Sequence, residues 1–542
     1  MKLLWHLKNG YKIDKLRGVF MHWAEKIAEE VISRNPNKEE YVCAAGISPS
    51  GSVHIGNFRD IATSYYVVKA LRKRGKKARL LFSWDEFDRL RKVPSNIAPL
   101  DPNFGDYIGM PYAWIPDPYK KYSSYAEYNE KEFEASLEEL GIEADYRYQA
   151  KLYTSGKYVE GIINAIKKRK EIYDVLMEYK TQDSDEGERE NYYPLNVYCE
   201  TCKKDTTKVI ASTDDGEEIT YTCKCGATHT VKIREYHNIK LVWKVDWPMR
   251  WGVEGVDFEP GGIDHAAASG SFVVASDIAK NVLGVEPPLF QGYGWLSIAG
   301  LGDMHSSTGN NITPATVLKV YEPDMVRWLF AKYEPKAPFS FNFDDTIIRH
   351  YSEFDKGLEQ FKKGEADEYN ASVYEFSLIN GADSINKVPF GVLSSVATIV
   401  DFNPTAVKEI LAKVGVDFAE EDKSRLERVK NWITVHQPSK LYKLLKDRND
   451  EFYAGLDAEE KDAVKKLCDY LESNDTIDEK EVQQFLYSVI NMEGLSKKEN
   501  MVRQQRFFKV FYNLMFGTDM GPRLYLFLAA IDKNEFINLL KF

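Results

Sequence analysis

The stretch GISPSGSVHIGNFRD, residues 46–60, joins an apolar segment to one with helical periodicity. Before it, YVCAAGI (41–47) is an uninterrupted apolar run, as expected for a parallel strand covered on both faces. After it, apolar residues recur three or four apart up to Gly75, which is placed to end a helix. The next apolar run, ARLLFSWD (78–85), predicts a second strand. Together these segments predict a strand–helix–strand unit with a right-handed crossover.

The connection between the first strand and the helix has the residue types of a phosphate-binding loop. Its tight turn consists of Ser48, Pro49, Ser50 and Gly51. These small residues let a phosphate chain approach backbone N–H groups and the positive end of the helix. Gly56 leaves room for a flat base, and His54 can donate a hydrogen bond to a phosphate oxygen. The loop therefore predicts an ATP-sized site, although a helix start with a histidine bonded to its neighbours explains the same letters.

Several blocks of the chain carry a family resemblance. PSGSVHIGN resembles the HIGH signature of class I aminoacyl-tRNA synthetases, in the H-I-G-N form of the class I lysyl-tRNA synthetases. Further blocks similar to that family follow in the same order: FSWDEFDRLRKVP (82–94), KLVWKVDWPMRW (240–251), FEPGGIDHAAASGSF (258–272) and FGTDMGPRLYLFL (516–528). The resemblance extends from about residue 15 to the C-terminus. It implies ATP-dependent ligation of L-lysine to tRNA(Lys) through a lysyl-adenylate, with Mg²⁺ accompanying ATP and with His54 and Asn57 acting in catalysis.

The resemblance also implies an α/β architecture with a Rossmann-type catalytic domain. That domain is expected in two halves, residues 1–152 and 237–315, separated by an inserted connective module at 153–236. A connecting domain resembling a stem-contact domain is expected at 316–388, and a helical anticodon-binding domain at 389–542. Apolar residues three or four apart in the last region agree with a helical bundle.

A lysine pocket needs negative charge at its far end and apolar walls along the alkyl stem. Asp85, Glu86 and Asp88 follow the second strand and supply such charge, while Trp243 and Trp247 supply walls. Ordinary ion pairs with the neighbouring arginines and lysine at 89–92 explain the same acids. With the family motifs, the predicted lysine site comprises Gly46, Asp85, Asp88, Trp243, Asp246 and His265.

The block PGGIDHAA (260–267) predicts contacts to the sugar of ATP. Gly261 and Gly262 allow close backbone approach, and Asp264 can accept hydrogen bonds from ribose hydroxyls. A Gly-Gly turn followed by a helix-capping aspartate explains the same letters without a ligand. The family resemblance implies the ribose role and assigns Gly262 and Asp264 to ATP binding.

Class I enzymes carry a second signature, K-M-S-K-S, whose lysines stabilise departing pyrophosphate. Here YGWLSIAG (293–300) predicts the last strand of the nucleotide fold, and GDMHSSTGNNITP (302–314) takes the place of the signature. Met304 and Ser307 match it. The resemblance assigns His305, Ser306 and Ser307 to catalysis, and Met304 and Thr308 to ATP binding.

Asp303 stands where the first signature lysine is expected. It puts negative charge near a negative leaving group, and losing one preorganised donor costs about 2.7 to 4 kcal/mol of transition-state stabilisation. Slow activation is the expected consequence, with His305 as a partial replacement donor. A catalytically impaired tRNA-binding paralogue is therefore an alternative, as is a class I synthetase for another amino acid.

The inserted module contains two cysteine pairs that flank one predicted hairpin. The pairs are Cys199-x-x-Cys202 and Cys223-x-Cys225, and Asp214-Asp215-Gly216 is the expected turn between them. Four thiolates brought together in this way suit tetrahedral Zn²⁺, and the site would be structural because all four positions are filled. Free thiols or a redox couple are the alternatives.

Composition limits the remaining possibilities. The chain has 542 residues, is 44% hydrophobic and carries a formal net charge of −11, which is typical of a folded multidomain protein. The N-terminal apolar run is too short for a signal peptide, and no run of about 18 apolar residues occurs. We therefore expect a cytoplasmic protein without a membrane segment; the sequence leaves its oligomeric state open.

Overall fold

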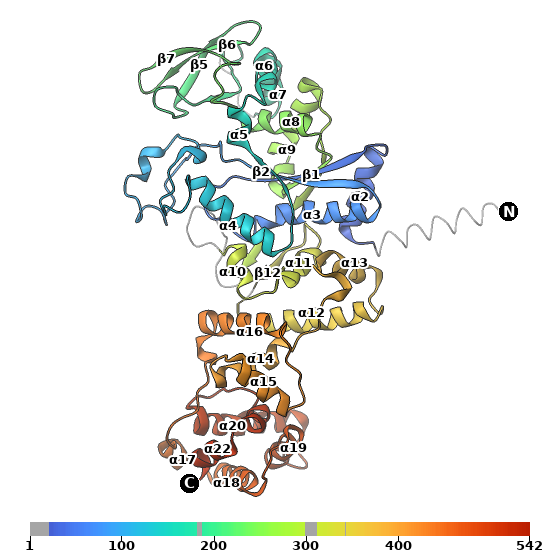
Figure 1. Ribbon diagram of the computed structural model, residues 1–542, viewed down its shortest axis with the longest axis vertical. Helices are drawn as coiled ribbons and strands as arrows, with labels where there is room; N and C mark the ends of the chain where they lie inside the picture. The colour runs from blue at the N-terminus through green and yellow to red at the C-terminus, as the bar shows by residue number, and fades with distance from the viewer. Residues whose placement is uncertain (1–20, 181–186, 299–311, 342) are drawn as a thin grey trace, which may run out of the picture. The chain divides into compact units, whose positions relative to one another are not determined.

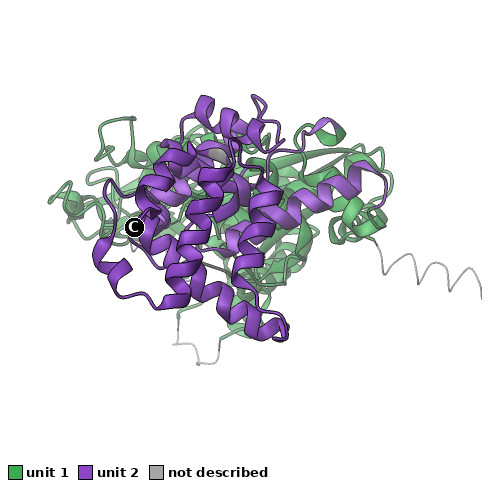
Figure 2. Cartoon of the chain, turned by 90° about the horizontal axis from the view of Figure 1, so that it is seen from below, with its two compact units in different colours: residues 1–318, 323–341, 366–382 green, residues 319–322, 342–365, 383–542 purple. Residues whose placement is uncertain are grey.

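The computed structural model describes residues 21–180, 187–298, 312–341 and 343–542 (Figure 1). The chain divides into two compact units, which are coloured separately in Figure 2. Unit 1 consists of Met1–Leu318, Pro323–Phe341 and Ala366–Ala382, and unit 2 of Lys319–Glu322, Asn342–Glu365 and Asp383–Phe542.

Unit 1 is built on a five-stranded parallel sheet with the order β10-β9-β1-β2-β3. The strands are β1 (Glu40–Ile47), β2 (Lys77–Trp84), β3 (Asp145–Tyr148), β9 (Phe258–Gly262) and β10 (Leu289–Tyr293). Strand order reverses between β1 and β9, which is the position where open α/β sheets bind ligands. The predicted α/β fold is confirmed.

Helices cover both faces of this sheet (Figure 1). Helix α3 (Phe58–Lys73) packs on one face, against β1 and β2, and α8 (Trp243–Glu254) and α9 (Ser271–Asp277) pack on the other. Val42 and Ala44 of β1 contact the cluster that contains Trp247 of α8. Burial on both faces explains why the sequence of β1 is apolar without alternation.

The segment expected to form the last strand of the nucleotide fold lies elsewhere. β11 (Leu296–Ile298) pairs in parallel with β12 (Phe339–Phe341) in a separate two-stranded sheet, so that prediction was wrong. The edge strand is β10, and the chain turns away directly after it. Gly294 permits this turn, because a Cβ there would lie 2.8 Å from the Lys336 carbonyl oxygen.

The insertion consists of helices followed by short antiparallel strands. Its elements are α6 (Val159–Lys167), α7 (Arg169–Glu178), β4 (Leu195–Val197), β5 (Thr207–Ser212), β6 (Glu218–Cys223), β7 (Thr228–Lys232) and β8 (Ile239–Leu241). The hairpin predicted at residues 214–216 joins β5 to β6, with Gly216 at φ 71°. Ile163, Ile219 and Met249 share one apolar core, so the insertion packs directly onto α8.

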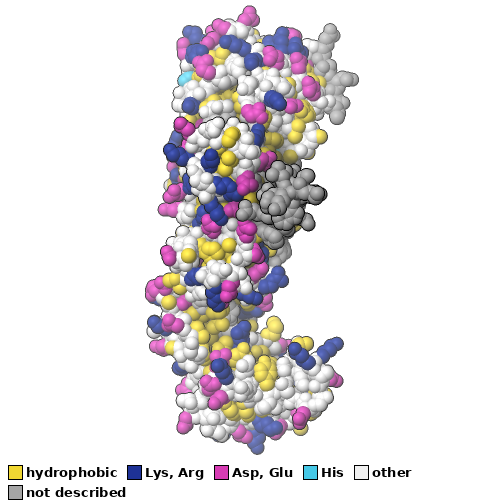
Figure 3. All heavy atoms as spheres, turned by 90° about the vertical axis from the view of Figure 1, so that its right-hand side faces the viewer, with side chains coloured by type: hydrophobic (Ala, Val, Ile, Leu, Met, Phe, Trp, Pro, Cys, Tyr) yellow, Lys and Arg dark blue, Asp and Glu magenta, His cyan; other side chains and the backbone are white. Residues whose placement is uncertain are grey.

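Unit 2 is helical, as predicted for the C-terminal region. Its longer helices are α12 (Thr346–Lys362), α15 (Pro404–Lys413), α16 (Asp422–Asn431), α18 (Ala458–Ser473), α19 (Glu479–Ile490), α20 (Lys497–Phe516) and α22 (Lys533–Leu540). Charged side chains of both signs are intermixed on the molecular face in Figure 3. Among the described residues no single helix has the length and hydropathy of a membrane span; residues 390–400 and 404–413 meet the criterion only jointly, across a bend of 117°.

Candidate active site

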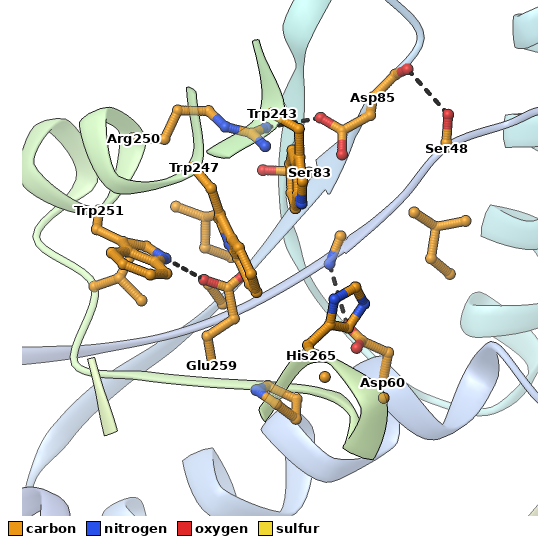
Figure 4. Close-up of a pocket in the computed structure, with 18 of the residues that line it drawn as sticks. Ser48, Asp60, Ser83, Asp85, Trp243, Trp247, Arg250, Trp251, Glu259 and His265 are labelled. Atoms are coloured by element: carbon orange, nitrogen blue, oxygen red, sulfur yellow. Dashed lines mark hydrogen bonds and ion pairs between the residues drawn. The ribbon is translucent and has the colours of Figure 1, made fainter. Parts of the chain in front are cut away.

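A cavity of about 230 Å³ lies at the carboxyl ends of β1, β2 and β9 (Figure 4). It is smaller than the sites that usually hold drug-sized ligands, which measure about 300 to 1,000 Å³, so its size suits an amino acid. Gly46, at the end of β1, lines it. A Cβ at Gly46 would lie 3.4 Å from the Ser83 carbonyl oxygen and 3.9 Å from Asp85 Oδ2, so the absence of a side chain leaves room at the end of β1.

Tryptophans from α8 form one wall of the cavity (Figure 4). The rings of Trp243 and Trp247 stack with centroids 4.8 Å apart and an interplanar angle of 21°. His265 lies edge-on to Trp247 at 5.9 Å, and Trp251 continues the wall inward. Such a surface can cover the methylene stem of a long side chain. Trp243, Trp247 and His265, all named from the sequence, thus line the same cavity.

Two buried carboxylates face this cavity without a cationic partner in the described part of the chain. Asp60 of α3 accepts the N–H of Gly46 at 3.2 Å and is hydrogen-bonded to Tyr293. Glu259 of β9 accepts the indole N–H of Trp251 at 2.7 Å. Burial raises the pKa of Glu259 to about 7, and burial together with the Glu259 charge raises the pKa of Asp60 well above its ordinary value.

The acids predicted from the sequence are held by buried cations. Asp85 lines the cavity, and Arg250 Nη1 donates to its Oδ1 at 2.8 Å. Asp88 pairs with Lys240 and Asp246 accepts from the Tyr153 hydroxyl, and neither aspartate is among the residues that line the cavity. Of the three acids expected to supply negative charge after β2, Asp85 lines the cavity, whereas Asp88 pairs with Lys240 and Glu86 accepts the N–H groups of Gln149 and Ala150.

The loop predicted to bind phosphate is held by α4 (Tyr125–Glu139). The Tyr125 hydroxyl donates to the Ser50 carbonyl oxygen at 2.9 Å, and Asn129 Nδ2 donates to that of Pro49 at 3.3 Å. Ser48 lines the cavity and donates weakly toward Asp88 Oδ2 at 3.4 Å. The turn from Ser48 to Gly51 is thus fixed beside the cavity, where α3 begins.

The H-I-G-N residues form the turn directly before α3, and Asn57 is the N-cap of that helix. His54 Nδ1 accepts the N–H of Asn57 at 3.2 Å, and Asn57 lines the cavity. The Ile55 N–H donates to the carbonyl oxygen of Ile312 at 2.8 Å, so the chain that follows the second signature meets this loop. The signature residues themselves, Asp303, Met304, His305, Ser306, Ser307 and Thr308, lie outside the described residues.

Glycines at the end of β9 bring backbone to the opposite side of the cavity. Gly261 and Gly262 both line it, and a Cβ on Gly261 would lie 2.8 Å from the Phe290 ring. Asp264 follows in the short helix η3 (Ile263–Ala266), outside the lining set. A Cβ on Gly262 would lie 2.5 Å from Asp264 Oδ1, so this carboxylate packs directly over the glycine.

Comparison with known proteins identifies the family. Residues 21–380 match the family described as tRNA synthetases class I (K). The chain belongs to this synthetase family. A lysine–tRNA ligase of Pyrococcus horikoshii is 34% identical over 96% of this chain and 99% of its own length. Ligases of the same name from Streptomyces coelicolor and Treponema pallidum are 33% and 34% identical, each over 96% of this chain and 98% of its own. Enzymes of this class use ATP and Mg²⁺.

The synthetase also carries the predicted thiol cluster. The four sulfur atoms of Cys199, Cys202, Cys223 and Cys225 all lie within 4.8 Å of one another, and two of the separations are 3.6 and 3.8 Å. A tetrahedral site with Zn–S bonds of about 2.3 Å spaces its sulfurs about 3.8 Å apart. The donor set therefore fits a closed zinc site.

Sequence reasoning missed several residues that line the cavity of this synthetase: Asp60, Arg250, Trp251, Glu259 and Tyr293. For two of these residues the sequence does carry a signal, which is an acidic residue within an otherwise buried element. Asp60 is an acid on an otherwise buried face of α3, and Glu259 is an acid inside a buried strand. Charged residues are almost never fully buried unless they are paired or functional, so both positions qualified as candidates.

Proposed function

We propose that this chain ligates L-lysine to tRNA(Lys), using ATP and Mg²⁺ to form a lysyl-adenylate. One observation carries the proposal: the cavity ends in two buried carboxylates, Asp60 and Glu259, that have no cationic partner among the described residues. An unpaired buried charge is costly, and a ligand ammonium would compensate it. The lysine–tRNA ligases to which the chain is similar support the same substrate.

In this proposal lysine lies along the tryptophan wall. Its methylene stem packs against Trp243 and Trp247, and its ε-ammonium is bound by Asp60 and Glu259. Its α-amino and carboxylate groups face the end of β1, near Gly46, Asp85 and His265. Asp88 and Asp246 act on this site through the cations that they bind rather than by contact with lysine.

ATP occupies the region where the two glycine-rich segments meet. Its phosphates would contact the turn from Ser48 to Gly51 and the N-terminus of α3, while Gly56, Gly262 and Asp264 would hold adenosine. His54 and Asn57 would donate to the phosphate oxygens. From the second signature, His305, Ser306 and Ser307 would stabilise the departing pyrophosphate, and Met304 and Thr308 would contact ATP.

The chemistry requires positioning rather than a covalent enzyme intermediate. A carboxylate oxygen of lysine attacks the α-phosphorus of ATP, and the bond to the β-phosphate oxygen breaks to release pyrophosphate. A hydroxyl of the terminal ribose of tRNA then attacks the lysyl carbonyl carbon, and AMP leaves. Because both reactants are held at the end of one sheet, orientation supplies much of the rate enhancement.

We propose a structural Zn²⁺ at Cys199, Cys202, Cys223 and Cys225, supported by the fit of the four sulfur atoms. Metal analysis of the purified protein should find one equivalent of zinc, and Cys223→Ser should lower that content and the stability of the insertion. A wild-type protein free of metal when purified from zinc-replete cells would refute this site.

The five-region division remains our proposal for how the tRNA is bound. The zinc-bearing insertion would contact the acceptor end, residues 316–388 the stem and the helical bundle the anticodon. A bundle rich in aromatic residues is compatible with stacking of unpaired bases. The substrate tRNA would place the reaction in the cytoplasm.

The deciding experiment is aminoacylation of total tRNA with ATP, Mg²⁺ and each standard amino acid in turn. Charging with lysine alone is the expected result, and charging with another amino acid would indicate a synthetase of different specificity. Asp303→Lys should accelerate activation, because it restores a donor at the signature position. Retention of tRNA without any charging would instead identify a non-catalytic tRNA-binding paralogue.

A further inference from the structure

Beside the cavity, five buried or half-buried side chains form a line of alternating charge. Arg250 Nη1 donates to Asp85 at 2.8 Å, and Arg250 Nε lies 3.5 Å from Asp246 Oδ2. Lys240 Nζ lies 3.7 Å from the same Asp246 oxygen and pairs with Asp88 at the other end. The line therefore runs Asp85, Arg250, Asp246, Lys240, Asp88, and Figure 4 shows its first link.

The formal charge of this line is −1, because three aspartates face two cations. Both cations are shared between carboxylates, so neither is left to neutralise the cavity end. Asp85 Oδ1 is taken by Arg250, whereas Oδ2 is directed toward β1: a Cβ built on Gly46 would lie 3.9 Å from it. Within the described part of the chain, Asp85 Oδ2 accepts no hydrogen bond from a cation, and it faces the end of β1.

Asp85 Oδ2 therefore adds a further cation-binding position to the cavity, next to Gly46, whose N–H donates to Asp60 at 3.2 Å. Lysine carries two ammonium groups, one at each end. The ε-ammonium is accounted for by the acids next to Trp251 and Tyr293. The α-ammonium then falls at the end of β1, where Asp85 Oδ2 lies.

We propose that Arg250 is a positioning residue that holds the Asp85 carboxylate so that its free oxygen accepts the α-ammonium of lysine. Asp246, Lys240 and Asp88 in turn fix the guanidinium. The proposal rests on the proposed function and deepens it by assigning the α-amine half of the site. Arg250 reaches the two aspartates with different nitrogens, Nη1 toward Asp85 and Nε toward Asp246, and a lysine at position 250 has a single nitrogen, so it would not reproduce both contacts.

The test compares ligands that lack one amine each. L-Lysine and 6-aminohexanoate, which has no α-amine, are titrated into the full-length wild-type protein and into Arg250→Lys and Asp85→Asn. Losing a charge-assisted hydrogen bond weakens binding about tenfold or more, so wild type should prefer L-lysine over 6-aminohexanoate by that factor. In both variants this preference should fall to about threefold or less, while the affinity for 6-aminohexanoate changes little.

Two controls make the result specific. Arg425→Lys alters an equally buried arginine that pairs with Glu322 and Asp355 in unit 2, and it should leave the preference unchanged. Asp246→Asn keeps the side-chain volume and replaces Arg250→Lys if that variant does not fold; it should also lower the preference.

The remaining outcomes overturn the proposal in distinguishable ways. Equal weakening of both ligands in Arg250→Lys would mean that Arg250 binds the carboxylate they share. An unchanged preference in Asp85→Asn would exclude Asp85 as the α-ammonium acceptor, and with it the positioning role. Failure of wild type to bind L-lysine at all would refute the proposed function itself.

Discussion

Two clusters of buried charge in this molecule differ in how completely the charge is balanced. In unit 2, Arg425 donates to Glu322 and Asp355 at 2.7 to 3.0 Å, and Lys387 also pairs with Glu322. Two acids thus face two cations. Although burial would raise it, these cations hold the pKa of Glu322 below its ordinary value.

The cluster at the cavity of unit 1 is left unbalanced. Among the residues that the structure describes, five acids, Asp60, Asp85, Asp88, Asp246 and Glu259, face two cations, Arg250 and Lys240. Burial also raises the pKa of Asp355 in the balanced cluster, so a raised pKa alone does not separate the two. What differs is that the unbalanced cluster places Asp60, Asp85 and Glu259 at the lining of a cavity. The difference shows that an uncompensated charge, rather than a buried charge as such, marks the place where a cation binds.

The largest effect is expected where a balanced cluster is broken. Arg425→Met leaves Glu322 and Asp355 buried with one cation, and breaking such a pair costs about 3 to 5 kcal/mol. Thermal and urea denaturation should show this loss for unit 2, while the dissociation constant for L-lysine stays unchanged. As a control, Arg234→Met removes an exposed arginine that pairs with Glu217, and no measurable destabilisation is expected. A weaker affinity for lysine in Arg425→Met would mean that the two clusters are not independent.

Removing an acid from the unbalanced cluster should leave stability intact and weaken lysine binding, the reverse of the result expected for Arg425→Met. Glu259→Gln keeps an oxygen that can accept the Trp251 N–H, but it removes a buried charge, so the unliganded protein should be as stable as wild type or more stable. Lysine binding should weaken about tenfold to a hundredfold, since hydrogen bonds to charged groups contribute about 1.5 to 3 kcal/mol. Thermal denaturation of the unliganded protein measures its stability, and isothermal titration calorimetry of the same preparation measures the dissociation constant for lysine.

Glu286→Gln is the matched control for this variant, because Glu286 is exposed and pairs with Arg34 at the surface. Its affinity for lysine should equal that of wild type. Marked destabilisation of Glu259→Gln with unaltered lysine affinity would assign Glu259 to the structure of β9 rather than to the ligand.

The fold was largely predictable because its signals are local. The apolar run of β1, the glycine that ends α3 and the turn at residues 214–216 each follow from a few neighbouring residues. The strand after β10 was misassigned because the chain leaves the sheet at Gly294, whose N–H donates to the carbonyl oxygen of Pro335, a residue far along the sequence. Such a long-range contact leaves no mark in the local pattern.

The contrast between local signals and long-range contacts also explains which site residues could be predicted. Motif blocks pointed to Gly46, Trp243 and His265, which do line the cavity. The charge pairing was not predictable: the sequence offers Arg89 as a neighbouring partner for Asp85 or Asp88, but Arg89 pairs with Asp205, and the partner of Asp85 lies 165 residues away. Whether a carboxylate is balanced depends on residues that only folding brings together.

The smallest expected effect is on the pH dependence of lysine binding, because protons compete with the lysine ammonium for the acids of the unbalanced cluster. The pKa of Glu259 is raised to about 7, so below that pH a proton occupies the position that the lysine ammonium requires. Lysine binding should therefore strengthen as the pH rises, with a dissociation constant about tenfold higher at pH 6 than at pH 8.

Asp60, whose pKa is also raised, acts in the same direction. The linkage also fixes the sign for stability. Folded Glu259 holds its proton more tightly than the unfolded chain does. The free energy of unfolding of the unliganded protein should therefore decrease as the pH rises from about 4.5 to 7. In Glu259→Gln the pH dependence of lysine binding and that of stability should both diminish. If the dissociation constant of this variant still changes tenfold between pH 6 and pH 8, the titrating group is Asp60, and Glu259 has no role in binding the ammonium.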